Sequence, residues 1–143
     1  MVMRNLIKII ENAQPHMIEV SDDSYSLEGY VTETGEEQID NWLSYRHHID
    51  DPTIVEMIRE RFSKIAFLNH ISVEEDARGK GMGNQLLSEF LTDAYDFGAE
   101  AVFLVADTAE NQQHGFDLLT WYEDWGFSVI HETGGGPLMM KAL

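Results

Sequence analysis

A glycine-rich loop, Val73–Gly83, constrains this chain more than any other stretch. A strand-like apolar run, Ile65–Val73, precedes the loop, and a helix-periodic run, Asn84–Phe97, follows it. Bases and glycines alternate toward the end of the loop: Arg78, Gly79, Lys80, Gly81 and Gly83. Glycine permits positive φ and close approach of a ligand to the backbone amides. An ordinary strand-to-helix turn is the simpler alternative, but unpaired amides at a helix start beside two cations favour phosphate binding.

Two common nucleotide-binding patterns do not fit this loop. The phosphate loop of nucleotide hydrolases needs Ser or Thr after the lysine, whereas Gly81 follows Lys80. The dinucleotide pattern G-x-G-x-x-G fails because Asn84 stands where its third glycine is required. The pattern R-x-x-G-x-G fits at Arg78, Gly81 and Gly83. The surrounding sequence LNHISVEEDARGKGMGNQLL resembles the fourth strand, pyrophosphate loop and third helix of the GNAT superfamily of acyl-CoA-dependent N-acyltransferases.

A second stretch, LTWYEDWGF at residues 119–127, resembles that family's (L/F)-Y-x-x-x-G-F motif through Tyr122, Gly126 and Phe127. Taken alone, Tyr122 also fits a core aromatic on an apolar helix face. The resemblance implies that Tyr122 is catalytic and donates a proton to the leaving thiolate. A phenol with an ordinary pKa of about 10 is suited to this step.

The resemblance covers residues 64–143 and implies an acetyl-CoA site. The residues expected to contact acetyl-CoA are Ile71, Ser72, Val73, Arg78, Gly79, Lys80, Gly81, Met82, Gly83, Asn84 and Asn111. The family often has an asparagine seven residues before the tyrosine, a position that Gly115 occupies in this chain. Asn111, four residues before Gly115, is expected to take its role if the loop is longer by that amount. The implied fold is α/β (α+β) with three layers. Its mixed, mostly antiparallel sheet contains a splayed parallel strand pair and is flanked by helices.

The chain pattern predicts the following elements. A hairpin is expected over residues 16–20 and 25–32, helices after Thr34 and Asp51, a central strand over 65–73, a helix over 84–97 capped by Gly98, a strand over 101–105, a helix ended by Gly126, and strands over 127–131 and 138–143. Residues 4–13 fit either a helix or a strand. The strands over 65–73 and 101–105, with the helix between them, then form a βαβ unit.

Strict alternation along the central strand places Ile71, Asn69, Phe67 and Ile65 on the side of Val73. His70 faces the other way unless a bulge reverses the parity. No general base is evident, so proton removal through a water chain is expected. The histidines show no metal-ligand spacing, and no metal is predicted.

Composition limits the partners. The 143 residues carry 9 basic and 26 acidic side chains, a net charge of −17, which disfavours a nucleic-acid face and suits a cationic partner. A single domain is expected, with a divergent acceptor-side half (1–63) and an acetyl-CoA-binding half (64–143). No apolar run is long enough to span a membrane, cysteine is absent, and the N-terminus lacks signal-peptide features, so a cytoplasmic location is expected.

The leading hypothesis is an N-acetyltransferase that moves an acetyl group from acetyl-CoA to a primary amine by direct attack in a ternary complex. The alternative is a non-enzymatic acidic interaction protein, either a decayed acyltransferase or a mimic of nucleic-acid charge that binds a basic partner. The amine acceptor, the acyl length and the oligomeric state, monomer or homodimer, stay open. The first 60 residues depart from the family pattern, because both of their clear helices run almost directly into the central strand.

Overall fold

Six strands and three helices form the part of the chain that the computed structural model describes, namely residues 16–34, 51–73, 81–106, 118–133 and 136–143. In chain order they are β1 (His16–Ser21), β2 (Tyr25–Glu33), α3 (Pro52–Arg61), β3 (Lys64–Val73), α4 (Met82–Asp96), β4 (Ala101–Val105), α6 (Leu118–Asp124), β5 (Ser128–Thr133) and β6 (Gly136–Ala142). These elements confirm the predicted hairpin, βαβ unit and C-terminal strands. The helix expected after Thr34 and the run at 4–13 lie outside the described residues.

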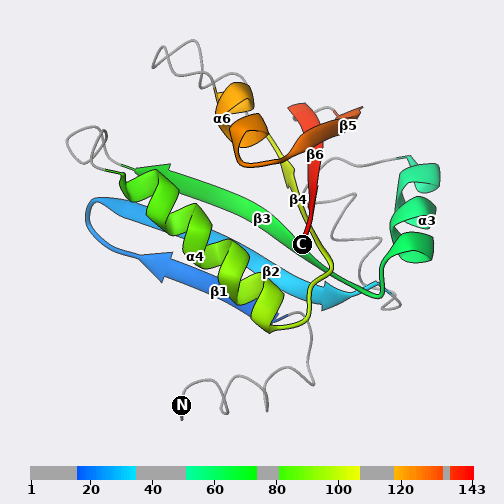
Figure 1. Cartoon of the computed structure of the whole chain (residues 1–143), viewed down its shortest axis with the longest axis horizontal. Coiled ribbons are helices and arrows are strands. Elements are labelled where there is room, and N and C mark those ends of the chain that lie inside the picture. The colour runs from blue at the N-terminus through cyan, green and yellow to red at the C-terminus, as the bar shows by residue number, and fades with distance from the viewer. Residues whose placement is uncertain (1–15, 35–50, 74–80, 107–117, 134–135) are drawn as a thin grey trace.

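The strands form one sheet with the order β1-β2-β3-β4-β6-β5 (Figure 1). Each neighbouring pair is antiparallel except β3 and β4, which run parallel. This arrangement confirms the expected mixed, mostly antiparallel sheet. Strands from both ends of the chain share it: β2 pairs directly with β3, and β1 pairs with the outer edge of β2.

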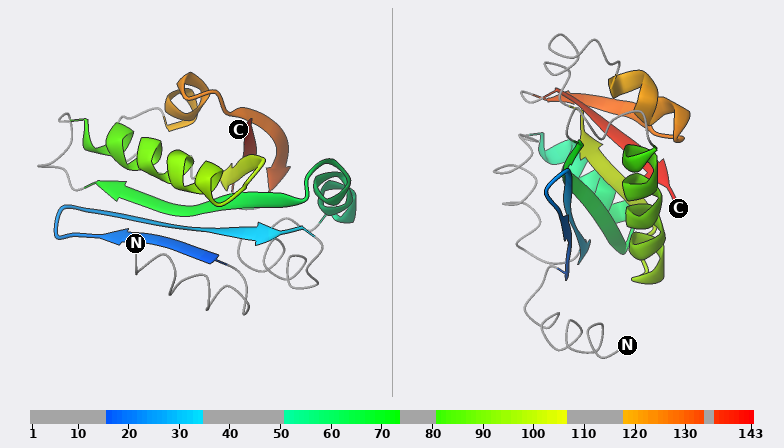
Figure 2. Two further views of the ribbon diagram at one scale, coloured as in Figure 1. Left: turned by 60° about the horizontal axis from the view of Figure 1, so that its bottom comes forward. Right: turned by 90° about the vertical axis from the view of Figure 1, so that its left-hand side faces the viewer.

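The helices cover opposite faces of the sheet and make three layers (Figure 2). On one face α4 and α6 pack over a core cluster that includes Leu68, Phe90, Val102 and Tyr122. On the other face α3 packs over a cluster built from Tyr30, Ile58, Ile65, Phe67, Ala101, Phe103 and Leu138. Burial of these apolar side chains on two faces fixes the sheet between the helices.

The start of α3 follows the prediction made for Asp51 and Pro52. Asp51 is the N-cap, and its carboxylate accepts a hydrogen bond from the amide of Thr53 at 2.9 Å. Pro52 occupies the first helical turn, where a missing N–H costs nothing. Since α3 ends at Arg61 and β3 begins at Lys64, the helix runs almost directly into the central strand, as the sequence indicated.

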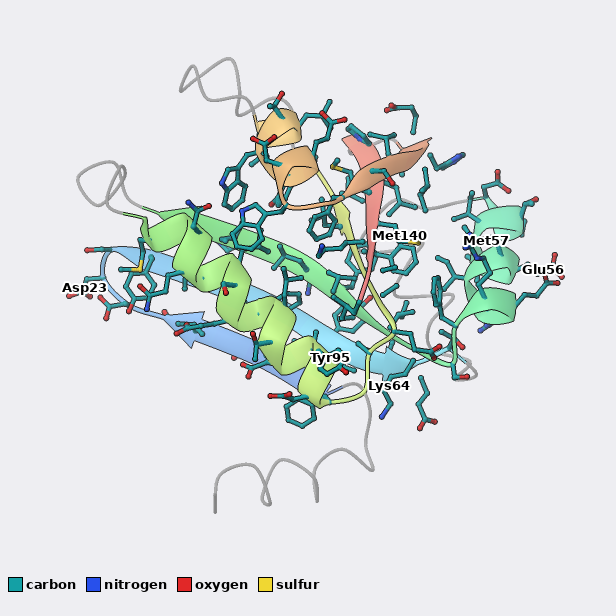
Figure 3. The ribbon with its side chains drawn as sticks, in the orientation of Figure 1. Asp23, Glu56, Met57, Lys64, Tyr95 and Met140 are labelled. Carbon is teal, nitrogen blue, oxygen red and sulfur yellow. The ribbon has the colours of Figure 1, made fainter. Side chains whose placement is uncertain are left out.

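The C-terminal end of α4 is anchored over the start of β3. Gly98, with φ of +91°, ends the helix, and its amide donates to the carbonyl of Tyr95. The ammonium group of Lys64, labelled in Figure 3, donates to the carbonyl of Phe97 at 3.1 Å. A cation at this end complements the helix dipole. The opposite end of α4 therefore points toward the end of β3.

A β-bulge in β3 contradicts the strict alternation expected there. Gly29 pairs with Leu68 but Glu28 pairs with His70, so Asn69 is an extra residue. Ile65 and Phe67 belong to the α3 face, whereas Ile71 packs with the α4 face. The expectation that Ile71 shares a face with Phe67 is therefore wrong, because the extra residue reverses the side-chain parity. The reversal places His70 on the α3 face.

Candidate functional site

The parallel strands β3 and β4 separate beyond the sheet centre, as Figure 1 shows. They pair only from Ala66–Val102 to Leu68–Leu104. Beyond Leu68, β3 continues for five more residues to Val73. Ile71, Ser72 and Val73 pair with β2 on one edge, and none of the described strands pairs with their other edge. The three residues expected to contact acetyl-CoA through their backbone thus lie on the diverging part of β3.

The N-terminus of α4 is the place where the sequence predicted an anion site. Gly81 is its N-cap with φ of +78°, in the left-handed region that favours glycine. A Cβ added there would meet nothing within 4 Å, so the space beside this residue is open. Met82, Gly83 and Asn84 follow as the first helical residues, whose amides have no intrahelical acceptor. No acidic residue lies in this turn to compete with an anion.

Four predicted contacts lie outside the described residues: Arg78, Gly79, Lys80 and Asn111. Of the described cofactor-contact predictions, Ile71 to Val73 lie at the end of β3, and Gly81 to Asn84 lie at the start of α4. The two groups therefore lie on either side of residues 74–80 in the chain.

Tyr122 is held by the C-cap of α6. The amide of Phe127 donates to the carbonyl of Tyr122 at 3.1 Å, and the amide of Gly126 donates to that of Glu123 at 2.9 Å. This bond pair is a Schellman motif, and Gly126 supplies its positive φ of +98°. The rings of Tyr122 and Phe127 meet edge-on, with their centroids 5.7 Å apart, and provide the accompanying apolar contact. The spacing of tyrosine, glycine and phenylalanine is therefore the spacing that this helix cap needs.

The first turn of α4 is hydrogen-bonded to α6. Oδ1 of Asn84 accepts from the indole nitrogen of Trp121 at 2.9 Å and from that of Trp125 at 3.1 Å. Trp121 precedes Tyr122, and their rings lie 5.1 Å apart. Tyr122 is only 4% exposed and packs in the core on the α4 face. These contacts place the helix of Tyr122 against the N-terminal end of α4.

Polar side chains gather around the bulge of β3. Nδ2 of Asn69 donates to Oε1 of Glu28 at 3.2 Å, and Nε2 of His70 lies 3.1 Å from Oγ of Ser26. Oδ1 of Asn69 is buried and has no hydrogen-bond partner in the described structure. Glu28 was not predicted from the sequence, because it lies 41 residues from Asn69 and only the strand pairing brings them together.

The described residues contain no cluster of three or more His, Cys, Asp or Glu side chains arranged to hold a metal ion. In the same segments, none of the helices is long and apolar enough to cross a membrane.

Comparisons with known proteins agree with this arrangement. A sequence model of the acetyltransferase (GNAT) family matches residues 15–127. Arylalkylamine N-acetyltransferase 2 from Aedes aegypti has a similar structure, with a TM-score of 0.53 and 18% identity over 86% of this chain and 70% of that one. Polyamine N-acetyltransferase from Drosophila melanogaster gives a TM-score of 0.53 and 10% identity over 84% of this chain and 68% of that one.

A third solved structure, of an acetyltransferase, gives a TM-score of 0.51 and 21% identity over 88% of this chain and 69% of that one. A search of curated proteins found no match to the chain. At these identities, likeness to the solved structures shows the fold alone.

Proposed function

Because the chain belongs to the acetyltransferase (GNAT) family, we propose that it transfers an acetyl group from acetyl-CoA to a primary amine of a cationic small molecule or protein. The observation that carries the proposal is the hydrogen-bonded contact between the first turn of α4 and α6. It brings an anion-facing helix start beside the helix of a buried tyrosine, next to the diverging end of β3.

In this proposal residues 64–143 bind acetyl-CoA. The pyrophosphate lies at Gly81 and the first amides of α4, with Arg78 and Lys80 as its cations. The absence of acidic residues from this turn and the open space at Gly81 support that placement. The pantetheine arm pairs with the backbone of Ile71 to Val73, whose outer edge faces away from β2. The first turn of α4 thus holds the pyrophosphate of acetyl-CoA, and β3 holds the pantetheine arm that carries the thioester.

The chemical step is direct attack of the amine nitrogen on the thioester carbonyl. A C–N bond forms, the C–S bond breaks, and the amine loses a proton while the thiolate gains one. We assign proton donation to the hydroxyl of Tyr122, because a phenol and a thiol have comparable acidity. A backbone amide near Val73 polarises the carbonyl as negative charge develops on its oxygen.

The acceptor amine approaches from the α3 face, near Glu28 of β2 and His70 of β3. The carboxylate of Glu28 attracts a cationic amine and is oriented by the amide of Asn69. The amine, with an ordinary pKa near 10.4 in lysine, must lose a proton before it attacks. That proton leaves through water toward Glu28 and His70. The net charge of −17 adds long-range attraction for a cation.

A panel of amines tests this function, with release of free coenzyme A as the measurement. The structural relatives named for arylalkylamines and polyamines supply the first two members, tryptamine and spermidine, and a lysine peptide supplies the third. We expect turnover with a cationic amine. Salt-sensitive binding to a basic protein without turnover on any amine would favour the acidic interaction protein instead.

Glu28→Gln tests the acceptor side. It removes the negative charge but keeps the oxygen that Asn69 contacts, so the KM for a cationic amine should rise roughly tenfold with acetyl-CoA affinity unchanged. Glu33→Gln, an exposed carboxylate farther along β2, is the matched control. Equal KM values for the two variants would remove Glu28 from the acceptor site.

A further inference from the structure

We propose that Asn84 is a positioning residue that couples acetyl-CoA binding at the start of α4 to the placement of Tyr122 on α6. The joint consists of three side chains, Asn84, Trp121 and Trp125, and we call it the Asn84 joint. The inference rests on the proposed function, which assigns the pyrophosphate to α4 and proton donation to Tyr122. It gives the side chain of Asn84 a structural task between the helices, whereas the sequence predicted a contact with acetyl-CoA.

The chemistry of the joint is specific. An indole N–H can only donate, and an amide oxygen has two lone pairs, so one asparagine satisfies two tryptophans. Oδ1 of Asn84 accepts both indoles, at 2.9 and 3.1 Å. Trp121 and Trp125 are four residues apart, which puts them on one side of the same turn. Both bonds therefore converge on one atom of α4.

The position of Asn84 makes this contact relevant to the donor substrate. Gly81 is the N-cap of α4, so Asn84 is the third helical residue and belongs to the turn whose amides face the anion. A ligand that orders this turn also orders Oδ1 of Asn84. The ring of Trp121 contacts that of Tyr122, with centroids 5.1 Å apart and planes tilted by 52°, so the order reaches the tyrosine through a single side chain.

Contacts with the rest of the fold hold the described part of α6, Leu118–Asp124, because helices in globular proteins take most of their stability from tertiary packing. Its C-terminal end is fixed by the Schellman motif of Gly126 and Phe127. The Asn84 joint adds two hydrogen bonds between the first turn of α4 and the C-terminal part of α6. Without the joint, acetyl-CoA binding at α4 should no longer change the position of Tyr122.

Two substitutions at one position separate the hydrogen bonds from the charge. Asn84→Leu has nearly the same size but accepts no hydrogen bond. Asn84→Asp keeps the acceptors and adds a negative charge at the anion-facing turn. We therefore expect Asn84→Asp to retain the joint and weaken acetyl-CoA binding about two- to fivefold through the charge. Asn84→Leu should lose the joint but keep its backbone amide in the turn, so it should still bind acetyl-CoA, with an affinity that differs from that of the wild type by the free energy of the coupling.

The measurement is the ¹H–¹⁵N NMR spectrum of the whole chain, in which each tryptophan gives an indole N–H signal. Trp121→Phe and Trp125→Phe assign the two signals, and Trp42 gives the third. Without ligand, both joint indoles should exchange with solvent up to about tenfold faster in Asn84→Leu than in the wild type or Asn84→Asp. On saturation with acetyl-CoA, the amides of Leu118–Asp124 should shift in the wild type and in Asn84→Asp, and much less in Asn84→Leu.

The outcomes are distinguishable from those of the proposed function. If Asn84→Leu binds acetyl-CoA in calorimetry and α6 responds as fully as in the wild type, the coupling role is wrong. Equal indole exchange in Asn84→Leu and Asn84→Asp would show that the joint does not hold the tryptophans. If the wild type binds no acetyl-CoA, the acyltransferase proposal fails and the coupling fails with it, whatever the indole exchange shows.

Discussion

Replacement of Gly29 by alanine should destabilise the sheet where the bulge of β3 lies. Gly29 pairs with Leu68 beside Asn69, and its α-carbon faces the ring of Phe90 from α4. A Cβ at this position would overlap Cε1 of Phe90 and lie 2.8 Å from Cζ of the same ring. It would also lie 2.7 Å from the backbone oxygen of Phe67. The φ angle of Gly29 is not positive, so these contacts alone decide the effect.

Two opposing free-energy terms set the change in the free energy of unfolding for Gly29→Ala. Overpacking a dense core costs about 1–3 kcal/mol, and the upper end applies because Phe90 is only 1% exposed and the Phe67 oxygen is backbone. Alanine also restricts the unfolded chain, which returns about 0.4–1 kcal/mol. The net loss in free energy of unfolding is therefore about 2 kcal/mol. For a chain of this size it lowers the melting temperature by roughly 4–8 °C.

Urea unfolding followed by tryptophan fluorescence measures this loss, with the slope m expected to stay unchanged. Gly29→Ala should cost less in a Phe90→Leu background, because leucine removes the ring edge but leaves the contact with Phe67. A loss below about 0.5 kcal/mol in the wild-type background would show that Phe90 does not press on Gly29. The same cost in both backgrounds would refute the ring contact specifically.

Two further substitutions test the donor site, each with a matched control. Tyr122→Phe should lower turnover about 10²- to 10⁴-fold and leave the affinity for acetyl-CoA unchanged. Tyr95, 66% exposed near the other end of α4 in Figure 3, supplies the control, since Tyr95→Phe should change neither quantity. Turnover by Tyr122→Phe equal to that of the wild type would remove the proton-donor role. Gly81→Ala forces a side chain into the left-handed region at a cost of about 1–2 kcal/mol and should weaken acetyl-CoA binding in calorimetry. Gly98→Ala carries similar strain at the far end of α4 and should leave that affinity intact.

The regular elements were predictable because their side-chain periods are strong. The capping pair Asp51 and Pro52 and the positive φ of Gly81 also follow from local chemistry that the sequence displays. The mixed, mostly antiparallel sheet and its three layers came instead from the family resemblance, because neither period nor capping states which strands pair.

The bulge at Asn69 escaped prediction for a different reason. An alternation pattern assumes one residue opposite one residue, and the extra residue is visible only in the pairing with β2. The same shift brings Glu28 to Asn69 and puts His70 on the α3 face, so one extra residue changes which side chains share a face beyond Leu68.

The role of Asn84 was also hidden in the sequence. Its position in the glycine loop motif predicted a ligand contact, which stays a prediction. Its side-chain oxygen accepts hydrogen bonds from Trp121 of α6 and from Trp125 just beyond the end of that helix. The tryptophans lie 37 and 41 residues away, and hydrogen bonds over such separations leave no local pattern. By contrast, the Gly126-Phe127 motif has a local cause, since a helix cap needs both residues at that spacing.

Calorimetric titration of the whole chain with acetyl-CoA tests the central claim most directly. The account predicts saturable binding to the wild type and clearly weaker binding to Arg78→Ala and to Gly81→Val, with Gly98→Ala unchanged. No measurable binding to the wild type, or an affinity that Arg78→Ala and Gly81→Val leave unaltered, would contradict it.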